Sequence, residues 1–285
     1  MATFYNQATL SYGGNTVNSN TTEAELLSGL EITKTAVTAT YDAGGNIVYV
    51  VTLGNLGGSP YNALTVTDDL GAYTSVGGGT VVPLTYVNGS ILYYLNGVIQ
   101  PPPAVTSIGN LEISGINIPA GGTATLIYEV TANEFAPIAA GSTIVNTAST
   151  NGGIGVGEIS DTATVAVNEA PELTIAKAVC PAVINDNEPL TYTLIVQNLS
   201  NVPIVATDGV VITDVFNPIL SDITVTLNGT GLIETTDYTY NALTGEFATV
   251  GGVITVPAAT YTQDPVTGAI TTTPGVSVLT VTGTV

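Results

Sequence analysis

The chain has 285 residues, a formal net charge of −20 and only two basic residues, Lys34 and Lys177. It contains no His and one Cys, whereas most metal, acid–base and nucleophile sites need His or paired Cys. The negative charge would repel nucleic acid and anionic membrane surfaces. We therefore expect a protein that is not an enzyme acting on outside substrates, with no cofactor, metal, nucleic-acid or membrane partner.

The chain begins MATFYNQATLSY, which has neither a basic stretch nor an apolar stretch typical of a secretory signal. We expect synthesis in the cytosol without such a signal. No apolar run reaches the length of a transmembrane helix. The next segment, Thr21 to Leu27 (TTEAELL), predicts a short helical turn or a linker.

The rest of the chain is rich in Val, Ile, Thr and Tyr that alternate with polar residues and are interrupted by Gly, Asn and Pro. Clear examples are Asn46 to Leu53, Ala63 to Asp68 and Thr191 to Val196. Alternation with period two is typical of half-buried strands, and many short strands separated by turns favour β-sandwiches. The pattern predicts an all-β fold.

An internal repeat organises the chain, because Leu30 to Val37 (LEITKTAV) resembles Leu173 to Cys180 (LTIAKAVC). The repeat predicts an N-terminal segment at residues 1–28, a first sandwich at 29–168 and a second, incomplete sandwich at 169–285. The aligned pairs are Lys34 and Lys177, Tyr49 and Tyr192, Asn55 and Asn198, and Asp68 and Asp214.

The two repeats end differently. The first closes with two predicted strands, Thr143 to Ser149 and Ser160 to Val167, which the second lacks after Ser277 to Val285. Thr3 to Ser11 resembles the first of these closing strands, and Asn6 aligns with Asn146.

A sandwich without its last strands exposes a sheet edge and core side chains, which a strand from another chain can cover. We expect the N-terminal strand to complete the second sandwich of a neighbouring copy. Such a head-to-tail contact gives an open homopolymer. The alternative is a disordered N-terminus with an accidental resemblance.

Strand parity places polar residues on apolar faces. Lys34 shares its face with Leu30 and Ile32, and Asn146 shares its face with Ile144. Lys177, Asp68, Asp214 and Asn6 lie on apolar faces in the same way. Burying such groups is costly unless they are paired, and desolvation lowers the pKa of Lys and raises that of Asp.

A neutral lysine amine is a nucleophile that can attack an Asn carboxamide while an Asp moves the protons, releasing ammonia. The sequence predicts a Lys34–Asn146 isopeptide bond within the chain, with Asp68 as acid and base. It also predicts a Lys177–Asn6 bond to the neighbouring copy, with Asp214 in that role. The alternative is a hydrogen-bonded Lys–Asp pair without covalent chemistry.

These motifs, K-[TA]-x-V, a Tyr strand ending in Asn, V-[TI]-T-D and V-N-T-A, resemble the DUF11 surface-repeat family. The order Lys, Asp, Asn is similar to isopeptide-forming Ig-like sandwiches of Gram-positive adhesins and pili. The chain also resembles subunits of ribbon-like spore appendages of clostridia. The resemblance implies a structural subunit of a filament on a spore or cell surface.

The sequence is also compatible with other functions. The same repeats could form an adhesin stalk that presents a binding site, and paired carboxylates of a hydrolase could meet in space. Cys180 is expected to be a small buried apolar residue, or alternatively to form an intermolecular disulfide. Asn185 to Glu188 (NDNE) is expected to be a solvated turn rather than a Ca²⁺ site.

Overall fold

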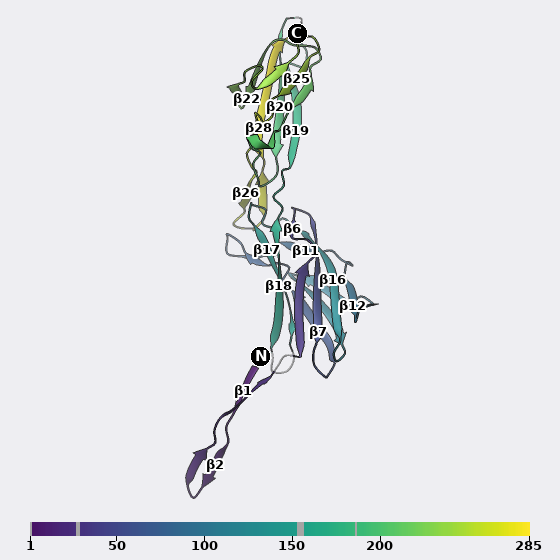
Figure 1. Cartoon of the computed structure of the whole chain (residues 1–285), viewed down its shortest axis with the longest axis vertical. Coiled ribbons are helices and arrows are strands. Elements are labelled where there is room, and N and C mark those ends of the chain that lie inside the picture. The colour runs from purple at the N-terminus through teal and green to yellow at the C-terminus, as the bar shows by residue number, and fades with distance from the viewer. Residues whose placement is uncertain (1, 27–28, 153–156, 186) are drawn as a thin grey trace. The chain divides into compact units, whose positions relative to one another are not determined.

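The computed structural model describes residues 2–26, 29–152, 157–185 and 187–285. These residues form strands, with a single short 3-10 turn, η1, at Ala206–Asp208, so the all-β prediction is confirmed. None of the helical structure in these ranges has the length and apolar character needed to cross a membrane. The chain divides into two compact units (Figure 1). The first holds Met1–Pro137, Gly141–Val167 and Asp264–Ala269, and the second holds Ile138–Ala140, Asn168–Gln263 and Ile270–Val285.

The first unit contains two six-stranded sheets. One has the order β13 (Val98–Gln100), β12 (Leu92–Leu95), β16 (Thr123–Ala132), β7 (Asn46–Asn55) and β5 (Leu30–Ala36), with β11 (Leu84–Tyr86) also paired to β16. The other has the order β14 (Ala104–Ile108), β15 (Asn110–Ile118), β8 (Tyr61–Asp68), β17 (Thr143–Asn151), β18 (Glu158–Val167) and β6 (Thr40–Tyr41). A small pair, β9 (Tyr73–Thr74) and β10 (Thr80–Val81), accompanies them.

Burial alternates along the long strands of the first unit, as the sequence predicts. In β16 and β17 every second side chain is buried, because successive residues of a strand point to opposite faces. The largest fully buried side chains include Tyr49, Leu126, Ile113 and Ile144, which come from both sheets. The core of the first unit therefore lies between the two sheets, and this is where parity places Lys34, Asp68 and Asn146.

The second unit has a five-stranded sheet and two smaller ones. The five-stranded sheet has the order β19 (Leu173–Cys180), β20 (Pro189–Asn198), β28 (Gly275–Thr284), β22 (Ser221–Leu227) and β23 (Thr230–Gly231). The others are β21 (Thr213–Val215) with β25 (Glu246–Thr249) and β24 (Tyr238–Tyr240), and β26 (Thr260–Gln263) with β27 (Ile270–Thr273). Phe216 is central to the core, with its ring centroid 5.0 Å from Tyr192 and 5.6 Å from Phe247.

The N-terminal residues form a two-stranded element that we call the N-terminal ribbon, Ala2 to Leu26 (Figure 1). Strand β1 (Ala2–Asn6) pairs with β4 (Thr22–Leu26), and β2 (Thr9–Tyr12) pairs with β3 (Asn15–Asn18). All side chains of residues 3–24 are exposed, so none of them belongs to a core. The predicted helical turn at Thr21 to Leu27 is wrong for the described residues, because pairing with β1 outweighs local propensity there. Leu27 itself lies outside the described residues.

Two buried asparagines close equivalent turns in the two units. The Asn55 amide donates to the carbonyl oxygens of Ser59 (2.9 Å) and Pro119 (2.8 Å), and its Oδ1 accepts from the Gly57 N–H (3.0 Å). The Asn198 amide donates in the same way to the carbonyl oxygen of Val202 (2.7 Å). These asparagines therefore hold the chain where β7 and β20 end.

Replacing Asn55 with Ala should lower the free energy of unfolding by about 2–4 kcal/mol, since several buried backbone groups lose their partners. Equilibrium urea unfolding measures this change. Asn88→Ala, which alters an exposed turn residue, should leave the stability within about 0.5 kcal/mol of the parent. Equal stability of the two variants would contradict the structural role of Asn55.

Candidate functional site

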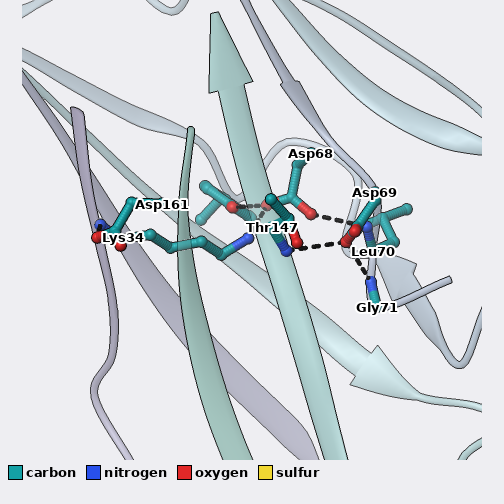
Figure 2. A network of polar contacts seen from close by, with 8 residues as sticks. Lys34, Asp68, Asp69, Leu70, Gly71, Thr147 and Asp161 are labelled. Carbon is teal, nitrogen blue, oxygen red and sulfur yellow. Dashed lines mark hydrogen bonds and ion pairs between the residues drawn. The ribbon is translucent and has the colours of Figure 1, made fainter. Parts of the chain in front are cut away.

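The first candidate site lies in the core of the first unit. Lys34 on β5 and Asp68 on β8 form an ion pair and hydrogen bond between the two sheets, and both side chains are 0% exposed (Figure 2). A charged pair without contact to water is expensive unless further partners complete it. The surroundings of Asp68 supply such partners.

Three donors reach the Asp68 carboxylate. Lys34 Nζ and the Tyr128 hydroxyl both donate to Oδ2, and the Leu70 N–H donates to Oδ1 at 2.8 Å. A second carboxylate, Asp161 on β18, accepts the backbone N–H of Lys34 at 2.7 Å (Figure 2). This hydrogen bond joins β18 to β5, so β18 covers the Lys34 side of the site.

Asn146 is buried nearby on β17 without a hydrogen-bond partner. Its side chain is 0% exposed, and among the described residues neither its Nδ2 nor its Oδ1 has a partner. A buried polar group left unpaired costs about 1–3 kcal/mol, so such a group in a native core requires an explanation. Tyr49 lies beside the site, with its ring centroid 4.7 Å from Lys34 Nζ.

Burial sets the protonation of this site. Desolvation lowers the pKa of Lys34, although the adjacent Asp68 opposes that change. Burial also raises the pKa of Tyr128 well above its usual value, so its hydroxyl keeps its proton. Burial raises the pKa of Tyr49 as well, and the Asn146 side chain opposes this rise. Asn146 is therefore close to Tyr49, which in turn lies beside Lys34. A lowered Lys pKa brings the neutral, nucleophilic amine closer to neutral pH.

The second candidate site repeats the Lys–Asp ion pair of the first. Lys177 on β19 forms an ion pair with Asp214 on β21, and Lys177 Nζ lies 4.4 Å from the Tyr192 ring centroid and 5.1 Å from that of Phe216. Here the side chains are 37% and 16% exposed, respectively, instead of fully buried. Water therefore reaches the Lys177 side chain, whereas the Asp214 Oδ2 that pairs with it is buried.

The exposure has a structural cause. In the first unit β8 lies between β15 and β17, whereas within the described residues β21 pairs only with β25. Every residue of β19 is exposed, and Ile175 is 58% exposed where the aligned Ile32 of β5 is 9% exposed. The second unit thus leaves open the place beside β21 and the apolar face of β19.

The structure brings Lys34 and Asp68 together in one unit and Lys177 and Asp214 in the other. It places Asn146 in the core of the first unit and leaves Asn6 exposed in the N-terminal ribbon, where Asn6 faces Thr22. Cys180 is exposed, so the expectation of a buried residue is wrong, because its position in β19 lies on the face opposite Lys177, and the aligned Val37 is also exposed.

Two residues of the first site were missed by sequence reasoning. Tyr128 faces Tyr49 across β16 and β7, and Asp161 is one of two acidic residues in β18, the other being Glu158. Strand parity alone places Tyr128 in the core. The second repeat has no Tyr at this position, because Val281 faces Tyr192 there, so comparing the repeats does not identify Tyr128. The two sites are therefore chemically different around the carboxylate.

No family model and no curated protein matches the chain. Among solved structures, it is similar to the major pilin subunit BcpA of Bacillus cereus, with 13% identity, a TM-score of 0.38, and coverage of 95% of this chain and 63% of that one. It is also similar to the full-length major pilin SpaD of Corynebacterium diphtheriae, with 9% identity, a TM-score of 0.34, and coverage of 85% and 58%.

A third similar structure is the collagen adhesin of S. aureus, with 13% identity, a TM-score of 0.30, and coverage of 55% of this chain and 54% of that one. The chain thus spans less than two thirds of each of these three proteins. Because these TM-scores are all below 0.5, we draw no functional conclusion from these similarities.

Proposed function

We propose that the protein is a structural subunit that polymerises head to tail. The N-terminal ribbon of one copy completes the second unit of the next, and isopeptide bonds strengthen each subunit and each joint. Spore or cell-surface appendages are the setting that we propose for such a filament. One contrast supports the proposal. The closed Lys34–Asp68 site has the unpaired Asn146 beside it, whereas no Asn aligned with Asn146 accompanies the open Lys177–Asp214 site among the residues of the second unit that the structure describes.

The chemistry proposed within the subunit uses Lys34, Asp68 and Asn146. Asp68 takes a proton from Lys34 Nζ, and the neutral amine attacks Cγ of Asn146. The new Nζ–Cγ bond forms, the Cγ–Nδ2 bond breaks, and Asp68 passes its proton to the departing nitrogen, which leaves as ammonia. Asp68 then takes the second proton from Nζ, so that a neutral amide and a protonated Asp68 remain. Tyr128 holds the Asp68 carboxylate in place during this exchange. No outside reagent is required.

The same chemistry is proposed at the joint between subunits, with Lys177 and Asp214 from one copy and Asn6 from the next. In the free subunit the Lys177 side chain stays partly exposed to water. Docking of the ribbon would exclude water from Lys177, as burial does at Lys34, and bring an Asn beside it. The covalent step would therefore follow docking.

Denaturing gel electrophoresis of boiled, reduced protein tests the proposed function. The parent should give a ladder of multimers, and Asn6→Ala should give monomer only. Asn15→Ala, another exposed Asn of the N-terminal ribbon, is the matched control and should keep the ladder. A parent that runs as monomer, or a ladder that survives Asn6→Ala, would contradict the proposed joint.

Tyr128→Phe should slow formation of the bond within the subunit by about tenfold or more. A hydrogen bond to a charged group contributes about 1.5–3 kcal/mol, and about 1.4 kcal/mol corresponds to tenfold in rate. Intact mass spectrometry of newly synthesised chain, sampled at intervals, follows the loss of one ammonia over time. Tyr93→Phe removes another largely buried hydroxyl, which donates to the Asn117 carbonyl oxygen at 3.0 Å, and should leave the rate unchanged. Equal rates for the two variants would exclude a role for Tyr128.

A further inference from the structure

Strands β1 and β4 of the N-terminal ribbon repeat the strand register of the hairpin that closes the first unit. In that hairpin, formed by β17 and β18, Thr143 faces Ala166 and Asn146 faces Ala163. In the ribbon, Thr3 faces Glu25 and Asn6 faces Thr22. When Thr3 and Asn6 are aligned with Thr143 and Asn146, their partners Glu25 and Thr22 align with Ala166 and Ala163 without a gap. The match ends there, because Thr9 faces Asn18 whereas the aligned Ser149 faces Ser160, one residue further along. Strands β1 and β4 are therefore equivalent to parts of both strands of that hairpin, and not to its first strand alone.

We infer that both strands of the ribbon dock on the second unit of another copy, in the register that β17 and β18 adopt in the first unit. This inference rests on the proposed head-to-tail polymer and specifies its joint. Strands β1 and β2 would lie beside β21, and β4 would cover β19. Both of the open places in the second unit are then filled by one element.

The register of the joint follows from the first unit. There Ala148 faces Asp68 and Ser149 faces Thr67 across β17 and β8. Because Asn6 aligns with Asn146 and Asp214 with Asp68, Ala8 should face Asp214 and Thr9 should face Thr213. A shift by one residue would turn the apolar side chains of the ribbon away from the core.

The apolar residues of the ribbon fit this placement. Ile144 is 2% exposed in the first unit, and the aligned Phe4 is 50% exposed in the ribbon. Leu10 is 64% exposed and aligns with Thr150, which is 3% exposed. In the inferred joint, Phe4 and Leu10 leave water and enter the core between β21 and β19, which also covers the exposed Ile175.

The segment that joins β3 to β4 brings a polar group to a defined place. In the first unit the Asp161 carboxylate accepts the backbone N–H of Lys34. Asn20 is the aligned residue of the ribbon, because Asp161 and Asn20 lie two residues before Ala163 and Thr22. Lys177 faces Leu194 as Lys34 faces its aligned partner Val51, so the backbone N–H of Lys177 points to the same open edge. We assign Asn20 as a positioning residue whose Oδ1 accepts this N–H.

Engineered disulfides test the register without relying on isopeptide chemistry. A full-length chain with Thr9→Cys and Thr213→Cys would carry Asn6→Ala, to prevent the isopeptide joint, and Cys180→Ser, to remove the exposed thiol. After mild oxidation, a non-reducing gel should show a multimer ladder that collapses to monomer with reductant. The matched control replaces Val215 instead of Thr213, on the same face of β21 but two residues away, and should cross-link at least tenfold less.

The outcomes separate the register from the proposed function. A cross-link through position 215 and not 213 would overturn the register. If the parent forms the Asn6-dependent ladder and neither cysteine pair cross-links, docking by both strands is wrong and the polymer stands. If the parent forms no ladder and the cysteine pairs stay monomeric, the polymer itself is wrong.

The role of Asn20 has its own test. Asn20→Ala should slow growth of the isopeptide ladder about fivefold to tenfold, which is the loss expected for one hydrogen bond. Thr21→Ala, which changes the next residue of the same segment, should grow the ladder at the parent rate. Equal rates for both variants would overturn the assignment of Asn20.

Discussion

Chains carrying Lys177→Ala, mixed with chains carrying Asn6→Ala, should form a covalent dimer and no larger covalent product. The first variant keeps the donor Asn6 and lacks the acceptor Lys177, whereas the second keeps the acceptor and lacks the donor. Only one of the two possible joints between them can react. Each variant alone should stay monomeric on a denaturing gel.

The composition of the dimer can be checked directly. Labelling one variant with a heavy isotope should show one copy of each variant in the product, lighter by one ammonia than their sum. Adding Asp214→Ala to the acceptor chain should prevent the dimer, because the proton carrier at the joint is lost. A dimer formed by either variant alone, or trimers in the mixture, would contradict a joint made only by Lys177 and Asn6.

Asn146→Ala should lower the free energy of unfolding of the first unit by about 4–5 kcal/mol. A cross-link that closes a loop of this size restricts the unfolded chain, and by analogy with a disulfide over about 100 residues it contributes about 4.7 kcal/mol. Equilibrium urea unfolding measures the loss. The sign of the change in unfolding free energy distinguishes the two cases. If Asn146 formed no bond, removing its buried, unpaired carboxamide would relieve a desolvation cost and stabilise the unit.

Lys34→Ala is the companion variant. It loses the same bond and also leaves Asp68 buried without its cation, so it should be less stable than Asn146→Ala by a further amount of about 3–5 kcal/mol. If Asn146→Ala is as stable as the parent while Lys34→Ala is destabilised, the site is an ion pair without a covalent bond.

Much of this architecture follows from the period-two pattern. The strands β7, β8, β17, β18 and β20 cover the segments predicted from alternation. Strand parity also predicted that Lys34 and Asp68 point into one core, since each shares its face with buried aliphatic residues. The repeat then carried that prediction to Lys177 and Asp214, which form the equivalent ion pair.

The remainder depends on contacts that a single strand does not encode. Tyr128 reaches Asp68 from a third strand, and Asp161 binds the Lys34 backbone from a fourth, so neither role is visible in local patterns. Cys180 is exposed although free Cys is usually buried, because strand parity places it on the face opposite Lys177, as it does the exposed Val37 of the first repeat. The helical composition around Glu23 gives a strand, because β1 provides a partner.

The most direct test of covalent linkage uses the two lysines as cleavage sites. Lys34 and Lys177 are the only basic residues, so trypsin can cut the denatured, unlinked chain at two places and give three fragments. A lysine whose Nζ is part of an isopeptide bond is no longer a substrate. We predict that the boiled polymer, digested with trypsin in denaturant, remains uncut at both lysines, and that Asn6→Ala is cut at Lys177 alone. Complete cleavage of the parent into three fragments would contradict both isopeptide bonds.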